Sequence, residues 1–213
     1  MALAVTGLLL GSGTAAAEVD NVSSMMSGAG QNIEVLQGDT RFTSVPPLDG
    51  SPLSREFFHS GYAGVNITGP GADALEGSLL TVGYQIGYPI ALAGATIGLN
   101  TPALGFVTGS DFNIGFADLL GEPIIGIDFG GGTDLVGDII PSQSLDIDLE
   151  PGGITDVPIL LDKPFDGASA LVRMSGVHGS VAGAIGAVSI RPYARVQLAS
   201  GDIVVTYGVP FQV

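Results

Sequence analysis

The stretch from Ser78 to Glu150 constrains the fold of this chain more than any other part. It contains no lysine or arginine, and no cation occurs anywhere between Arg55 and Lys163. Its charges are carboxylates: Asp111, Asp118, Glu122, Asp128, Asp134, Asp138, Asp146, Asp148 and Glu150. A soluble domain normally mixes both signs over its surface. Charge of one sign within an apolar sequence therefore predicts one wet, negative face and one dry face.

Large apolar residues alternate with small or polar ones through much of this stretch. Even positions from Val82 to Leu92 are large and apolar, and the same period of two appears at 125–129 and 144–150. A period of two is typical of a strand with two different faces. The run from Leu79 to about Asn100 has twice the roughly 9–11 residues that a tilted strand needs to cross a bilayer. We therefore expect a membrane-spanning strand; an ordinary half-buried sandwich strand is the alternative.

Composition favours a β-rich protein and excludes several other classes. The chain has 213 residues, of which 34 are glycine and 13 are proline. Frequent turns with many β-branched residues favour strands. The net charge of −15 argues against nucleic-acid binding, because phosphate contacts need clustered cations. The absence of cysteine excludes a disulfide scaffold and a thiolate metal site.

The first 17 residues have the features of a secretory signal peptide. An apolar run, Leu3–Leu10, is followed by three alanines and then by the acidic Glu18. An apolar segment ahead of small residues is typical of a cleaved export signal, although its positively charged start is missing here. No apolar run reaches the roughly 18 residues of a membrane helix. We expect export, and membrane insertion by strands alone.

The rest of the chain predicts a sandwich interrupted by one hairpin. Residues 18–78 and 151–213 read as short strands separated by turns that contain glycine or proline, whereas 79–150 forms the hairpin. The two histidines, His59 and His178, lie far apart and have no acidic partners at the spacing of a catalytic triad. We interpret both as hydrogen-bonded structural residues. No cofactor, metal or enzymatic activity is expected.

Several long motifs resemble the MspA-type porins of the mycobacterial outer membrane. They are LSREFFHSG from Leu53, ITGPGADALEGSL from Ile67, GYQIGYP from Gly83, VHGSVAGAIGAVSIRPYARVQLASGD from Val177 and VTYGVPF from Val205. The motifs stand in the family's order and cover most of residues 53–213. Residues 18–52 match poorly.

The resemblance implies a goblet-shaped homo-octamer. Each copy would give a soluble β-sandwich to the rim and one long hairpin to a shared sixteen-strand transmembrane β-barrel. Assembly of several copies is also required physically, because two strands cannot close a barrel and unpaired strand edges are not tolerated in lipid. The number eight comes from the family. The chain would lie in the outer membrane of a mycolic-acid-containing bacterium.

The candidate pore residues are all on the predicted hairpin. The family's best-known members carry a tight acidic cluster just past a Thr-Pro pair, but here Thr101–Pro102 is followed by nine residues with a single acid, Asp111. The connection from Pro102 to Pro141 is also longer than in those members. We expect the constriction to be formed by Asp111, Ser110, Asp118 and Glu122. The alternation predicts that the pore is lined by Asp128, Asp146 and Asp148.

The function expected from these observations is a water-filled, cation-preferring porin for passive diffusion of small hydrophilic solutes. Its partners would be other copies of the chain, outer-membrane lipid, and the solutes and cations that pass. The alternative is a secreted β-sandwich binding module whose hairpin is an extended contact arm. An enzyme is disfavoured, because no catalytic motif converges in the sequence.

Asp111 is predicted to be the main charge of the constriction. Two carboxylates in a ring, roughly 10 Å apart in water, repel by about 0.4 kcal/mol, and the ring attracts cations by a potential that salt screens. Asp111→Asn should therefore lower the preference for cations, most strongly at low salt. Reversal potentials under a salt gradient measure this. Unchanged selectivity in Asp111→Asn, with selectivity lost in Asp118→Asn or Glu122→Gln, would move the constriction to those residues.

Overall fold

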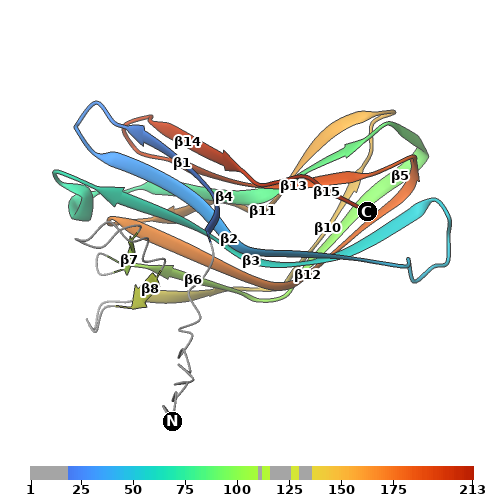
Figure 1. Ribbon diagram of the computed structural model, residues 1–213, viewed down its shortest axis with the longest axis horizontal. Helices are drawn as coiled ribbons and strands as arrows, with labels where there is room; N and C mark the ends of the chain where they lie inside the picture. The colour runs from blue at the N-terminus through green and yellow to red at the C-terminus, as the bar shows by residue number, and fades with distance from the viewer. Residues whose placement is uncertain (1–18, 110–111, 116–125, 130–135) are drawn as a thin grey trace, which may run out of the picture.

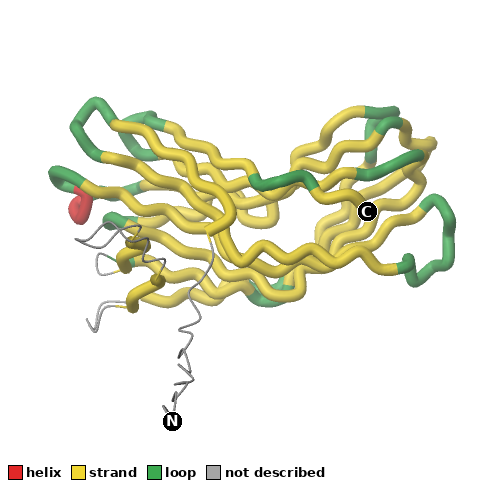
Figure 2. The backbone as a smooth tube through the Cα atoms, in the orientation of Figure 1, coloured by secondary structure: helices red, strands yellow, loops and turns green. Residues whose placement is uncertain are grey.

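The computed structural model describes residues 19–109, 112–115, 126–129 and 136–213. They fold as two large β-sheets packed face to face and one separate two-stranded sheet (Figure 1). Most strands run along the long axis of the molecule, and most of their connecting loops gather at its two ends (Figure 2). Within these residues, the regular structure is all strand apart from a single 3-10 turn at Ala72–Ala74, which confirms the prediction of an all-β protein. No helix among these residues is long and apolar enough to cross a membrane.

The first sheet is antiparallel and contains β5 and β10, which lie within the predicted hairpin, whereas the first end of that hairpin lies in β4 of the second sheet. Its order is β1-β2-β3-β12-β5-β10, and β6 and β9 extend β5 and β10. Its strands are β1 (Val19–Met26), β2 (Asn32–Val45), β3 (Ser54–Thr68), β12 (Ser169–Ile185), β5 (Ile90–Thr101), β10 (Gln143–Asp148), β6 (Leu104–Thr108) and β9 (Val136–Ile140).

The second sheet covers one face of the first. Its order is β11-β4-β13-β14, and β15 pairs with β13. Its strands are β11 (Gly153–Phe165), β4 (Ser78–Tyr88), β13 (Ser189–Gln197), β14 (Ile203–Tyr207) and β15 (Phe211–Gln212). The short strands β7 (Phe112–Gly115) and β8 (Gly126–Phe129) pair with each other.

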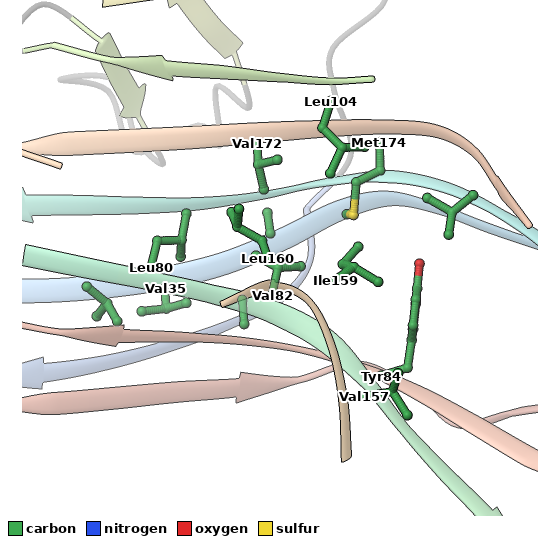
Figure 3. Close-up of a cluster of buried hydrophobic side chains, with 14 of the residues drawn as sticks. Val35, Leu80, Val82, Tyr84, Leu104, Val157, Ile159, Leu160, Val172 and Met174 are labelled. Atoms are coloured by element: carbon green, nitrogen blue, oxygen red, sulfur yellow. The ribbon is translucent and has the colours of Figure 1, made fainter. Parts of the chain in front are cut away.

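The core lies between the sheets and is built from alternate residues of the central strands. In β4 the inward residues are Leu80, Val82, Tyr84, Ile86 and Tyr88, none of them more than 4% exposed. Val35, Val172 and Met174 face them from the first sheet (Figure 3). Each fully buried large apolar side chain contributes about 1.5–3 kcal/mol. The period of two therefore reflects burial in a sandwich along this strand.

The expected single strand from Leu79 to Asn100 is wrong. The chain turns at Pro89, so that β4 lies in the second sheet and β5 returns in the first. Proline fixes φ and has no N–H to donate to a ladder. The turn is also closely packed: a side chain on Gly152 would lie 2.6 Å from the Pro89 carbonyl oxygen, and one on Gly186 would lie 2.7 Å from Pro89 Cγ. The strand that pairs with β12 and β10 therefore begins at Ile90.

His59 is a structural residue of the core, as expected. Its side chain is 2% exposed, its Nδ1 lies 2.7 Å from the hydroxyl of Tyr84, and the Phe42 ring stacks on it at 4.3 Å. Burial lowers the pKa of His59 to about 4, although the nearby charge of Asp20 opposes the shift. Burial also raises the pKa of the Tyr84 phenol. Both rings are therefore neutral at pH 7.

The depressed pKa of His59 predicts a loss of stability in acid. Between its unfolded pKa of about 6.5 and its folded pKa of about 4, the unfolded chain binds a proton that the folded chain does not. The native state should lose on the order of 3 kcal/mol across this window as pH falls. NMR titration of 13C-labelled histidine tests it, with His178→Gln as the assignment control. A His59 signal that titrates near 6.5 would contradict the buried, neutral state.

Candidate functional site

The two arms of the hairpin form one ladder that is anchored to the sandwich. Thr96–Thr101 pairs with Gln143–Asp148, and Leu104–Thr108 continues in the same register against Val136–Ile140. On its other side the first arm pairs with β12, again in one register from Ala182 to Ala170. The antiparallel pairing of β12 thus fixes the direction in which the hairpin runs.

The buried and outward faces of the ladder exchange their residues at a line formed by two prolines and one glycine. Thr101 and Leu104 are both buried, although residues three apart on a flat strand face opposite sides. The same reversal occurs on β12 between the buried Met174 and Val177, where Gly176 has φ 72°. Pro102 on the first arm and Pro141 on the second lie in the same line. The face that points away from the core therefore changes from one set of alternate residues to the other.

Asp146 and Asp148 lie on the outer face of the first sheet, as the alternation predicts. Both are exposed, whereas Ile147 between them is half-buried and packs against the core. Asp146 is directly opposite Gly98, and a side chain on Gly98 would lie 3.2 Å from its Oδ1. The bare backbone of Gly98 thus leaves room for the carboxylate beside Ser180.

A histidine–glutamate pair extends this acidic face across the sheet. The row that contains Asp146 and Gly98 continues through Ser180 to Glu56 on β3. His178 Nε2 bonds to Glu56 Oε1, and the Phe58 ring lies 5.0 Å from the histidine ring. We define the acidic face by Glu56, His178, Ser180, Gly98, Asp146 and Asp148. Sequence reasoning missed Glu56 and its pairing with His178, because strand pairing alone brings these residues together.

The other predicted pore residues are only partly described. Ser110, Asp111, Asp118 and Glu122 lie outside the described residues. Asp128 pairs through its backbone with Asn113, but its side chain is not among those described. The acidic residue Asp138 bonds to Lys163 of β11 at 2.6 Å and ties the hairpin to the second sheet.

Within the described residues, no three or more His, Asp or Glu side chains are grouped to hold a metal ion. The acidic face is formed by residues on neighbouring strands; Asp146 and Asp148 are exposed on it, whereas Glu56 and His178 are half-buried and line a shallow hollow. Such a surface can attract and guide cations through fixed charge, without forming covalent intermediates.

Comparison with known proteins gives one consistent family. A family model described as MspA matches residues 29–212. Porin MspC of Mycolicibacterium smegmatis is 38% identical over 212 residues, which cover 99% of this chain and 92% of that protein. Porin MspD of the same organism is 38% identical over 91% of this chain and 87% of the MspD chain. Porin MspA is 37% identical over 99% of this chain and 94% of the MspA chain.

The two sides of β10 should tolerate substitution differently. Ile147 lies opposite Ile97, which is fully buried, so Ile147→Arg would bring a charge against the core and should cost at least about 2 kcal/mol. Asp146→Asn keeps the shape of an exposed side chain and should change stability by less than about 0.5 kcal/mol. Denaturant unfolding of the two variants measures this. The reverse ranking would show that the register of β10 is wrong by one residue.

Proposed function

Because the chain belongs to the MspA family, we propose that it is an outer-membrane porin that passes small hydrophilic solutes. Copies of the chain form a closed ring, an octamer by family resemblance. The sandwich of each copy stands at the rim, and its hairpin enters a shared barrel. The lumen prefers cations. The protein lies in the outer membrane of a mycolic-acid-containing bacterium and reaches it by export.

The hairpin that extends from the sandwich is the observation that carries this proposal. Its distal strands, β7 and β8, pair with each other and with no further described strand. Such a pair leaves a row of backbone N–H and C=O groups unbonded on each side. In hydrocarbon each unbonded group costs several kcal/mol, so only a closed barrel is stable there. Neighbouring hairpins supply the missing partners.

The length of the hairpin tip is sufficient for this role. The tip has 27 residues between Thr108 and Val136, the last residues of the ladder that holds β6 to β9. A tilted barrel strand needs about 9–11 residues to cross a bilayer. The two arms of the tip can therefore each span the membrane. The predicted hairpin of 79–150 is accordingly proposed with narrower bounds, 90–148, and only its distal part lies in lipid.

The charge of the hairpin supports a preference for cations. No lysine or arginine occurs between Arg55 and Lys163, so each hairpin contributes only negative side chains to the ring. On the acidic face, Asp146 and Asp148 are exposed and form no ion pair with a described residue. Rings of carboxylates are the usual cation filters of channels. We assign Asp146 and Asp148 to the wall above the constriction.

A secreted binding module is the second candidate. The exposed sandwich surface would suit it, because the same two-sheet architecture is common in adhesive domains. Fractionation of the native host separates the two functions. A porin stays with the cell envelope and requires detergent for release, whereas a secreted module appears in the medium.

The purified protein should conduct only as a closed ring. In planar bilayers we expect stepwise conductance increments, and a reversal potential whose sign shows cation preference. Native mass measurement of the same preparation should find one ring size and no monomer inserted in lipid. A monodisperse monomer that conducts, or a ring that does not conduct, would contradict the proposal.

A further inference from the structure

We propose that the β11 edge of one sandwich docks into a groove on the opposite edge of the next copy. This inference rests on the proposed ring and names the surfaces that close it. A cyclic ring needs two different, complementary surfaces on each subunit, because each contact is head to tail. The sheet order places β11 at one edge of the second sheet and β14 at the other.

The β11 edge carries exposed apolar side chains on a strand that has no outer partner among the described strands. Of these strands, β11 pairs with β4 alone. Ile154 is 69% exposed and Leu161 is 64% exposed. Leu161 lies in a bulge that is held in place, since Asp162 has φ 47° and its carboxylate accepts a bond from Arg195 at 2.8 Å. Folded proteins cover or protect such an edge, because it otherwise recruits other strands.

The groove lies where β1 meets the segment after β14. Its volume is about 580 Å3, and it is lined by Phe42 and Phe211, whose rings stack at 5.3 Å, and by Val209 and Pro210. A bond of 2.8 Å from Asn21 on β1 to Thr206 on β14 holds the two sheets together beside it. Val209 is 81% exposed, so the apolar wall of the groove faces outward.

Charge supports a second copy as the occupant. Arg41 lines the groove, is exposed, and forms no hydrogen bond or ion pair within the described part of the chain. Asp20 in the same groove is already bonded to the amide of Thr40. On the β11 edge Asp156 is exposed and is also without a hydrogen bond or ion pair among described residues. An unpaired cation on one edge and an unpaired anion on the other favour head-to-tail contact between copies.

Cysteine cross-linking tests the contact cleanly, because the chain has no cysteine of its own. Three single variants are made, Ile154→Cys, Leu161→Cys and Val209→Cys, and each β11 variant is also combined with Val209→Cys in one chain. A short bismaleimide is used, since a disulfide requires Cα atoms within about 7 Å. We expect little product from the single variants. A combined variant should give a covalent ladder that ends at the ring size and consumes most of the monomer.

The controls separate this inference from the proposed function. Leu48 is 95% exposed but lies in the β2–β3 loop, so Leu48→Cys with Val209→Cys should give no ladder. An intact ring by native mass without cross-links in either combined variant would overturn the contact and leave the porin proposal standing. Efficient dimers from Ile154→Cys alone would show a symmetric contact and also overturn it. Absence of any ring in the unmodified chain would overturn both.

A second measurement needs no cysteine. Ile154→Asp should raise the protein concentration required for half-assembly about tenfold or more, because an apolar side chain is lost from the contact. Leu48→Asp makes the same change at an exposed site outside the contact and should leave that concentration unchanged. Equal effects of the two substitutions would overturn the assignment.

Discussion

The backbone groups along the edges of the hairpin impose the constraint on which the rest of this structure depends. In a pair of strands, only the backbone N–H and C=O groups that point to the other strand form hydrogen bonds. Lipid provides no hydrogen-bond partner for the remaining groups. β7 and β8 are such a pair within the described residues. In the proposed barrel, a single chain cannot meet this requirement alone. There the sandwich holds the hairpin and also brings copies together, so that the missing partners come from neighbours.

β12 is the strand that allows the sandwich to do this. Its 17 residues pair with β3 on one side and with the first arm of the hairpin on the other. Packing fixes its position: a side chain on Gly179 would lie 2.1 Å from the Phe57 ring, so the ring occupies the space above a bare glycine. Because the hairpin continues a sheet and does not hang from a loop, its direction is set by hydrogen bonds.

The sequence was sufficient to predict an all-β protein but not which strand belongs to which sheet. A period of two predicts two different faces, yet it is the same for a lipid-facing barrel strand and for a sandwich strand. For this reason β4 was assigned to the hairpin, although Pro89 marks its end. Asp146 and Ile147 face opposite sides of β10, which depends on local alternation alone, whereas the pore-lining role of Asp146 stays a prediction.

Longer-range features could not be predicted in the same way. Glu56 and His178 meet only because β3 and β12 pair. The two residues are 122 positions apart, and no pattern in a single sequence relates residues at that separation. The reversal of faces depends on Pro102, Pro141 and Gly176 lying in one line across three strands. Each of these residues is a recognisable local signal. Their alignment appears only after the register is known, and it determines which acidic side chains can share a wall.

The acidic face has an energetic consequence for the proposed ring. Each copy adds carboxylates that face those of its neighbours, and like charges roughly 10 Å apart in water repel by about 0.4 kcal/mol per pair. Several such pairs per contact oppose assembly, more strongly at low salt because screening weakens. Apolar contact between sandwiches is insensitive to this effect. In the proposed ring, apolar contact at the rim would therefore offset this repulsion together with the hydrogen bonds between hairpins, and the exposed apolar side chains at the β11 edge and around the groove suit that role.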